Sequence, residues 1–296
     1  SKDKAQPMNP SNSLASDAWS ALSKNRAAWF SAIALTTMVL LVLLGPLVSP
    51  YEVDQTNWSK LAKPPSMQDG HVFGTDDLGR DLFVRTMYGG RISLMVGIVA
   101  TLVSVLIGVS YGAISGFVGG KVDSIMMRIV DVLYAMPFLF FVILLMVFFG
   151  RSIFLIFVAI GAVNWLDIAR IVRGQTLTIK GKEFVDAAKA GGVSTFRIIF
   201  RHIVPNLMGI VVVYVALTVP QVILVESFLS FLGLGVQEPM TSWGALVNQG
   251  ARQMESSPWI LVFPALFLAV TLFCFNFIGD GLRDALDPKD RTNTNE

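Results

Sequence analysis

Apolar segments long enough to cross a lipid bilayer constrain this chain more than any other feature of its sequence. A membrane-spanning helix needs about 20 mostly apolar residues, because the hydrocarbon core is about 30 Å thick and each helical residue advances about 1.5 Å. Hydrophobic residues make up 53% of the 296 residues, and charged residues make up only 15%. The sequence therefore predicts an all-α, polytopic membrane protein with six spans, at 29–48, 92–118, 130–149, 152–171, 203–232 and 259–282.

The distribution of lysine and arginine predicts which ends of the spans face the cytoplasm. Cytoplasmic loops of membrane proteins carry an excess of these residues. With the N-terminus inside, 16 of the 23 basic residues lie on the cytoplasmic side and the other 7 lie outside. Both termini are therefore expected in the cytoplasm. Residues 1–28 form a tail, either flexible or with a short helix on the membrane surface, and residues 29–296 form the transmembrane domain.

A polar, basic stretch at 182–206 interrupts the apolar segments on the predicted cytoplasmic side. Glu183 and Asp186 stand at the N-terminal end of a predicted helix within 182–200, where the helix dipole favours negative charge. Small residues follow, so this helix can press its backbone against a partner, and paired glycines can then end it. The stretch is either a docking helix or a solvated connector. The candidate docking residues are Glu183, Asp186, Ala187, Ala188, Gly191 and Gly192.

Charged residues also gather in the long loop that follows the first span, on the predicted outer side. Three aspartates there are interleaved with two arginines, which predicts either a solvated ion-pair network or a docking surface outside the membrane. The aspartates are spaced too irregularly for an EF-hand loop, so a metal site is not expected. The residues are Asp76, Asp77, Asp81, Arg80 and Arg85.

Four glycines recur at every fourth position of the second span, at Gly108, Gly112, Gly116 and Gly120. This spacing places them on one helical face, where the backbone of a neighbouring helix can approach closely. The neighbour is expected either within this subunit or in a partner subunit.

The second outer loop, 233–257, contains a sequence typical of a short helix, from Ser242 to Met254. Thr241 or Ser242 can cap its N-terminus, and Trp243 is predicted to anchor it at the membrane interface. Such a helix can line the mouth of a pore or cover packed helix ends.

One carboxylate falls within a predicted span, far from its cytoplasmic end. Ionisable side chains cost roughly 2.5–3.5 kcal/mol at mid-bilayer on insertion scales, so Glu226, near the outer end of the fifth span, suggests a function. Together with Pro220 and Gln221 it is a candidate for the lining of a translocation path. A buried hydrogen bond between helices explains Glu226 equally well.

Two further aspartates, Asp131 and Asp167, lie within about two turns of the predicted cytoplasmic ends of their spans. They are expected to reach the membrane interface or to pair with Arg128 or Arg170. The spans supply no continuous series of ionisable groups of the kind that a proton relay requires.

The motifs of catalysis are missing from the sequence. The nearest match to a nucleotide-binding loop, at Gly120 and Lys121, has Ser115 in place of the first glycine and Val122 in place of the magnesium-binding hydroxyl. The Gly-x-Ser-x-Gly match at 108–112 lies inside the predicted second span and not at the strand-to-helix turn that a nucleophile elbow requires. No His-Glu-x-x-His motif occurs, and the two histidines are predicted on opposite sides of the membrane. We therefore expect no catalytic residue, metal or cofactor in this chain.

The segment DAAKAGG followed by RHIVPN resembles the Glu-Ala-Ala signature of the membrane-spanning subunits of ATP-binding-cassette (ABC) importers. Asp186, Ala187, Ala188 and Gly192 stand at the signature positions, with Asp186 where the family usually has glutamate. FGTDDLGRD, GGRISLMVG, GGKVDSIMMR, WLDIARIVRGQTL, ESFLSFLGLG and FIGDGLRDALDPKDR are similar to blocks of the dipeptide, oligopeptide and nickel branch, most closely its oligopeptide permease C subunits from Gram-negative bacteria. The similarity extends from about Trp19 onward.

The resemblance implies a fold, partners and a mechanism. It implies a type I importer permease in the bacterial inner membrane, paired with a homologous permease subunit to form the translocation path for short peptides. Each permease would place a cytoplasmic coupling helix in a cleft of one of two ATPase subunits, where ATP and Mg²⁺ bind, while an extracytoplasmic binding protein delivers the peptide. Dipeptides, cell-wall peptides or nickel are alternative cargoes, and a self-sufficient channel or carrier is the alternative mechanism. Nucleic acid is not an expected partner.

Overall fold

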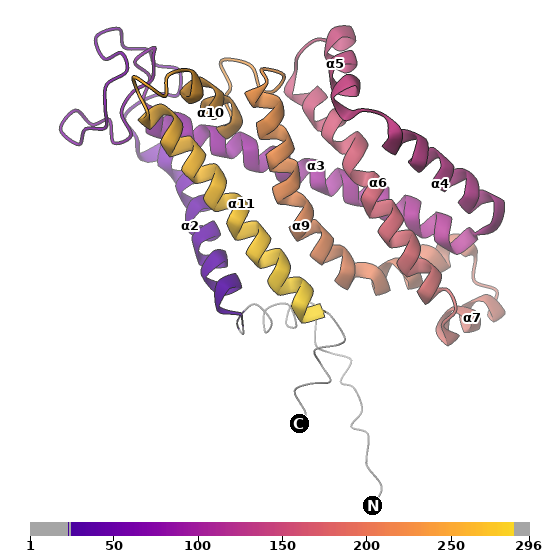
Figure 1. Ribbon diagram of the computed structural model, residues 1–296. Coiled ribbons are helices and arrows are strands. Elements are labelled where there is room, and N and C mark those ends of the chain that lie inside the picture. Colours follow the sequence, from indigo (N-terminus) through magenta and orange to yellow (C-terminus); the bar gives the residue numbers. More distant parts are fainter. Residues whose placement is uncertain (1–22, 24, 287–296) are drawn as a thin grey trace, which may run out of the picture.

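The computed structural model describes residue 23 and residues 25–286, and these residues are predominantly helical (Figure 1). The predicted tail at 1–28, with its optional surface helix, therefore lies almost entirely outside the described residues. The helices are α2 (Arg26–Val48), α3 (Leu82–Val118), α4 (Gly120–Ala135), α5 (Phe138–Phe149), α6 (Ile153–Ile179), α7 (Glu183–Ala190), α8 (Thr195–Ile198), the π-helix η1 (Ile199–Ile203), α9 (Val204–Phe231), α10 (Trp243–Arg252) and α11 (Trp259–Leu286).

The six predicted spans are present, but one of them is broken. Five stretches are long and apolar enough to cross a membrane as single helices, and α4 with α5 makes a sixth only as a bent pair. The two helices meet at 82°, at a break of no more than four residues. The span predicted at 130–149 is thus not one continuous helix, because the break falls inside it. Pro137 causes the break, because it lacks a backbone N–H and forces Met136 into an extended conformation (φ −72°, ψ 130°).

The second span begins earlier than predicted, at Leu82 instead of residue 92. The side chain of Asp81 accepts a hydrogen bond from the backbone N–H of Val84 at 2.9 Å and so caps the helix. Hydropathy missed this start because charged residues such as Arg85 lie in the first turns. The resulting 37-residue helix is about 55 Å long and exceeds the roughly 30 Å hydrocarbon thickness, so it must tilt or project from the bilayer.

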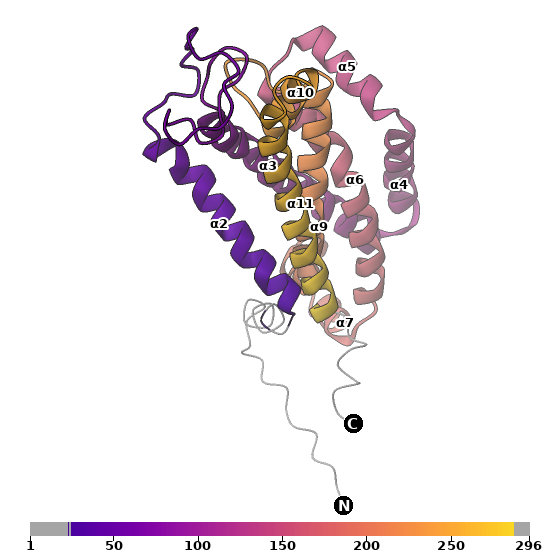
Figure 2. The same cartoon turned by 60° about the vertical axis from the view of Figure 1, so that its left-hand side comes forward.

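The helices place the polar segments at two opposite ends of the molecule. The start of α2, the end of α11 and α7 lie at one end, whereas α10 and the loop between α2 and α3 lie at the other (Figures 1 and 2). This arrangement agrees with the orientation predicted from the basic residues, with α7 on the cytoplasmic side. Helix α3 contacts α2, α6, α9, α10 and α11 and forms the centre of the bundle.

The glycine face of α3 packs against α6 within the same chain. A Cβ added at Gly108 would lie 2.7 Å from Cβ of Ile168, and one at Gly116 would lie 2.8 Å from the backbone oxygen of Arg173. Gly112 is in still closer contact with the α6 backbone. These three glycines therefore serve packing inside the subunit, as one of the two alternatives predicted. The fourth, Gly120, has nothing within 4 Å and instead adopts φ +59° in the turn between α3 and α4.

Gly112→Leu is expected to destabilise the bundle by up to about 3 kcal/mol, because the side chain would force α3 away from α6. Gly174→Leu is the matched control, since Gly174 is exposed on α6 and has no atom within 4 Å of an added Cβ. Thermal unfolding of the detergent-purified chain measures both. Equal melting temperatures for the two variants would show that close α3–α6 packing does not hold the fold together.

Candidate functional sites at the two ends of the bundle

At the cytoplasmic end, α7 presents most of its surface to solvent. Glu183, Asp186 and Ala187 are exposed, as are Gly191 and Gly192 beyond its C-terminus. The acids stand in the first turn, as predicted, and Lys189 pairs with Asp186 across one turn at 3.1 Å. An exposed ion pair of this kind contributes at most about 1 kcal/mol, so this face remains open to a partner.

The paired glycines end α7 in the way that the sequence predicted. Gly192 has φ +73°, a conformation that glycine adopts without strain. The N–H of Val193 donates to the carbonyl of Ala188 at 3.1 Å, and the N–H of Gly192 donates to that of Lys189 at 3.0 Å. This pair of bonds is the Schellman motif, which fixes the direction in which the chain leaves the helix.

The opposite face of α7 is fixed in the core. Val185 is 0% exposed and belongs to a cluster that includes Phe117 of α3, Ile179 of α6 and Leu207 of α9. Ala188 is half-buried and packs against the same cluster. Ala188 therefore lies partly on the inner face, unlike Ala187. Since one cluster joins α7 to the ends of three spans, a force on α7 reaches those spans directly.

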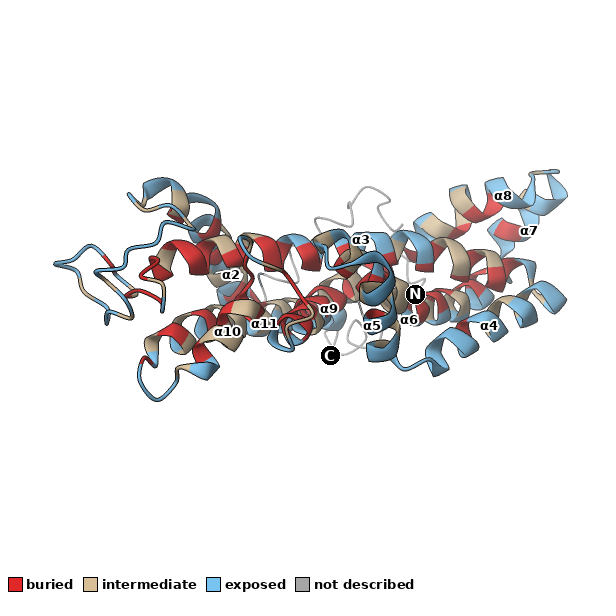
Figure 3. Cartoon of the chain, turned by 90° about the horizontal axis from the view of Figure 1, so that it is seen from above, coloured by how far each residue is buried: buried red, intermediate tan, exposed pale blue. Residues whose placement is uncertain are grey.

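The arm formed by α4 and α5 is held at its cytoplasmic end by ion pairs to α6. Arg173 donates two hydrogen bonds of 2.6 Å to the carboxylate of Asp123. Arg170, one of the two partners predicted for Asp131, pairs with it at 2.8 Å. Asp167 is exposed and has no ion pair among the described residues. Elsewhere the arm is mostly exposed: the only buried side chains in α4 and α5 are Val130 and Val142 (Figure 3).

The three residues proposed for the path do not share a surface in the single chain. Pro220 is buried inside α9, which continues through it, while Gln221 is exposed. Glu226 is 0% exposed, and its carboxylate accepts hydrogen bonds from Ser93 of α3 at 3.1 Å and from Ser230 of α9 at 2.7 Å. The hydrogen-bonded alternative for Glu226 is thus the one seen here.

Glu226→Leu is expected to destabilise the chain by about 1–3 kcal/mol, because it leaves buried hydroxyls of two serines without an acceptor. Glu226→Gln keeps one carbonyl acceptor and is expected to cost less. Melting temperatures of both variants, together with transport per folded complex, separate the roles. A loss of transport by Glu226→Gln at unchanged melting temperature would favour a carboxylate that lines the path.

Helix α10 closes the outer end of the bundle. Ser242 caps it, accepting a hydrogen bond from the N–H of Ala245 at 3.2 Å, as predicted. Trp243 is not an interfacial anchor, which corrects the prediction: it is 0% exposed and donates to the carbonyl of Thr86 at 2.9 Å. An indole in the core satisfies its N–H in this way while its rings pack on neighbouring helices. Helix α10 contacts α3, α9 and α11 and so covers packed helix ends, one of its two predicted roles.

Three residues of the charged outer loop, Asp76, Arg80 and Arg85, belong to a buried ion network, which corrects the first of the two predicted alternatives, a solvated network. Asp76 is 0% exposed, and its Oδ2 lies 2.7 Å from Nε of Arg80 and 3.4 Å from Nε of Arg85. Both arginines are nearly inaccessible, at 4% and 1%. Burial favours the uncharged guanidinium, but Asp76 and Glu238 outweigh it and raise the pKa of Arg80 above its ordinary value. The loop folds over the network, and this requires tertiary contacts that sequence spacing does not reveal.

Glu238 completes the network from a distant part of the chain, and the sequence analysis missed it. Its Oε2 lies 2.9 Å from Nη1 of Arg80, and its Oε1 lies 3.4 Å from Nη2 of Arg85. We call Asp76, Arg80, Arg85 and Glu238 the outer ion network. A signal was available, since Glu238 is the one acidic residue between Glu226 and Glu255 and lies in the second outer loop, on the same predicted side of the membrane as Arg80 and Arg85.

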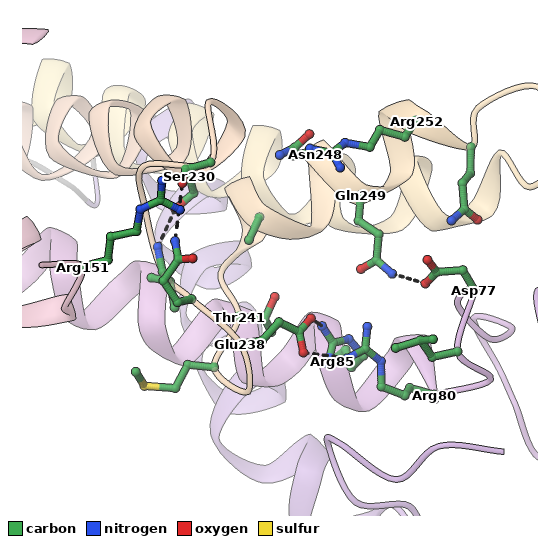
Figure 4. A pocket seen from close by; sticks show the side chains of 17 residues that line it. Asp77, Arg80, Arg85, Arg151, Ser230, Glu238, Thr241, Asn248, Gln249 and Arg252 are labelled. Carbon is green, nitrogen blue, oxygen red and sulfur yellow. Dashed lines mark hydrogen bonds and ion pairs between the residues drawn. The ribbon is translucent and has the colours of Figure 1, made fainter. Parts of the chain in front are cut away.

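A polar pocket opens beside the outer ion network, with a volume of about 480 Å³ (Figure 4). Its walls come from the first outer loop, the turn between α5 and α6, the loop 233–242 and α10. We call this cavity the outer pocket. The charged side chains that line it are Asp77, Arg80, Arg85, Arg151, Glu238 and Arg252.

Two family models match the chain. Residues 105–292 match the model described as "Binding-protein-dependent transport system inner membrane component", and residues 13–65 match the "N-terminal TM domain of oligopeptide transport permease C". The first match covers more than half of the chain. It includes α7, the loop 233–242 that lines the outer pocket, and α10.

Curated relatives are similar over nearly the full length. The oligopeptide transport system permease protein OppC of Escherichia coli K12 is 63% identical over 94% of this chain and 92% of its own. OppC of Haemophilus influenzae is 59% identical over 94% and 90%. The dipeptide transport system permease protein DppC of Bacillus subtilis is 50% identical over 95% and 87%.

A solved structure shares the fold. A chain from the MetNI methionine ABC transporter, in an inward-facing conformation, superimposes with a TM-score of 0.55 at 17% identity, covering 69% of this chain and 97% of that one. The helical fold, the polar segments at both ends and these similarities agree with one another. The chain belongs to the inner membrane permease subunits of binding-protein-dependent ABC importers, in the branch that contains the oligopeptide permease C proteins.

Proposed function

We propose that this chain imports short peptides as half of a translocation path, and that a homologous permease subunit supplies the other half. Relatives at 59–63% identity are named oligopeptide permeases, which supports peptides as the cargo. The exposed apolar arm formed by α4 and α5 supports a second membrane subunit, because much of its surface has no partner within the described chain.

Helix α7 couples this path to an ATPase subunit. The observation that carries this role is the two-sided construction of α7, with an exposed acidic and small-residue face and with Val185 fixed in the core. The chain itself has no nucleotide-binding loop, so ATP and Mg²⁺ bind to two partner ATPase subunits, which perform the hydrolysis. Each ATPase receives the coupling helix of one permease in a surface cleft.

The mechanism follows from the rigidity of that connection. When ATP brings the two ATPases together, each displaces its coupling helix. Because α7 shares one packed cluster with α3, α6 and α9, the ends of these spans move with it as a rigid body. The path then opens outward toward an extracytoplasmic binding protein, which releases the peptide into it. ATP thus shifts the equilibrium between two conformations through contacts that differ in the two states.

Peptide uptake tests the cargo. A bacterial strain that lacks this chain but retains the other subunits should not accumulate labelled tri- to pentapeptides, and the chain restored from a plasmid should return uptake. Dipeptides, a cell-wall tripeptide and Ni²⁺ serve as parallel cargoes. Unchanged tri- to pentapeptide uptake without the chain, or restored uptake of one of these other cargoes alone, would overturn the assignment to oligopeptides.

A further inference from the structure

The two carboxylates of the outer ion network differ in how firmly they are held. Asp76 is fully buried, and besides contacting both arginines it accepts backbone N–H bonds from Leu78 and Arg80 at 3.0 and 2.9 Å. The side chain of Glu238, in contrast, is 65% exposed although it contacts the same two guanidinium groups. The arginines thus form a buried site for two carboxylates, one permanent and one accessible to solvent.

The accessible carboxylate is easy to replace. Solvent competes for the Glu238 carboxylate, which is mostly exposed, and screens its attraction to the two buried arginines. A second carboxylate that enters the outer pocket can take over the bonds to Arg80 and Arg85, so that no buried guanidinium loses its counter-charge. Burying these groups unpaired would be much more costly, which explains why Glu238 covers them in the single chain.

The mouth of the outer pocket adds positive charge that the chain leaves unused. Arg151, from the turn between α5 and α6, and Arg252, from the end of α10, line the pocket and are exposed (Figure 4). Within residues 25–286, neither takes part in a described ion pair. The lining residues therefore carry four arginines against two acids, of which Asp77 bonds to Gln249. The rim arginines therefore attract an incoming carboxylate, which then pairs with Arg80 and Arg85 deeper in the pocket.

We propose that the outer pocket is a docking socket for an acidic side chain of the extracytoplasmic binding protein, and that Glu238 occupies this socket until the partner arrives. This inference rests on the proposed function, because it presupposes such a partner. Docking displaces Glu238 from Arg80 and Arg85. Since Glu238 belongs to the loop between α9 and α10, docking is thereby linked to the outer ends of the spans.

A protein partner fits the pocket better than the transported peptide does. The pocket is built from outer loops, the α5–α6 turn and α10, so it lies at the end of the bundle and not along its length. A fixed charge on a protein surface can approach the rim arginines from the aqueous side. A path that admits peptides of varied sequence, in contrast, gains nothing from a strong site for one carboxylate, because tight binding there would slow release.

The test measures docking of the purified binding protein to the complete importer in lipid nanodiscs. Arg151→Gln combined with Arg252→Gln should raise the dissociation constant about 5- to 10-fold at low salt, and the effect should shrink at high salt. Glu238→Gln should lower the dissociation constant about 2- to 5-fold, because it weakens the competing carboxylate. Lys63→Gln is the control, since Lys63 is an exposed positive charge of the first outer loop, at the same end of the molecule, and does not line the pocket.

A socket predicts that the dissociation constant rises in the rim variants and falls in Glu238→Gln. If Glu238 formed only a structural ion pair, the dissociation constant would rise in both. Basal ATP hydrolysis should be unchanged in all variants. Binding of labelled free peptide to the same nanodiscs, without the binding protein, identifies the other source of a carboxylate. If Glu238→Gln tightens peptide binding alone, or if it weakens docking, the socket is refuted. If the wild-type complex docks the binding protein and imports peptide, and the variants dock equally well, only the socket is refuted. The proposed function then remains intact.

Discussion

Ala187→Arg is expected to abolish peptide uptake while the assembled complex continues to hydrolyse ATP. The side chain of Ala187 lies on the exposed face of α7, so arginine there is compatible with insertion and folding. In the complex, however, it would bring a bulky charge into the contact between α7 and the ATPase. An unpaired buried charge costs about 3–5 kcal/mol, which corresponds to a loss of uptake of more than about a hundredfold.

The measurement is the ratio of peptide uptake to ATP hydrolysis, both determined on the same purified complex. Gly192→Arg is expected to act similarly, with added backbone strain at φ +73°. Ala188→Arg is a less selective test, because Ala188 also packs against the core. Thr178→Arg provides the matched control at an exposed position near the inner end of α6. Normal uptake by a correctly inserted Ala187→Arg complex would exclude α7 as the docking helix.

Asp76→Asn is expected to produce the largest loss of stability, about 3–5 kcal/mol, because it leaves two buried guanidinium groups with too little negative charge. The asparagine side chain has nearly the same shape, so the effect is electrostatic and not one of packing. Glu238 is too exposed to compensate, since solvent screens its interaction with Arg80 and Arg85.

Asp77→Asn is the control for this substitution. Asp77 is the next residue and is exposed, and its hydrogen bond from Gln249 survives the change to an amide oxygen. It should change stability by less than about 1 kcal/mol. Thermal unfolding in detergent at low and high salt compares the two, and the Asp76→Asn deficit should persist at high salt because the network is buried. Similar melting temperatures would mean that the outer ion network does not stabilise the fold.

Features that depend on local chemistry could be predicted from the sequence. The spans follow from hydropathy, the end of α7 from its glycines, and the N-cap of α10 from Ser242. Arg170 was one of the two partners expected for Asp131, because both lie near the cytoplasmic membrane face, and it is the one that the structure pairs with it. In each case the interacting groups are close in sequence or are brought together by the membrane itself.

Features that depend on tertiary contacts could not be predicted. The outer ion network joins Asp76 to Glu238, which is 162 positions away, and whether its charges are buried depends on how the loops close over them. Tryptophan is a residue type typical of interfacial anchors, yet α10 folds back and places Trp243 in the core. Pro137 lies inside the span predicted at 130–149, and the 82° angle at this break depends on how α4 and α5 pack.

Reconstitution into proteoliposomes tests the central claim, that this chain is a permease subunit driven by partner ATPases, most directly. Peptide accumulation should require the paired permease, both ATPases, the binding protein and ATP, and omission of any one should abolish it. The chain alone should transport nothing, with or without ATP. Peptide or ion flux through the purified chain by itself would contradict this account and would identify a self-sufficient channel or carrier.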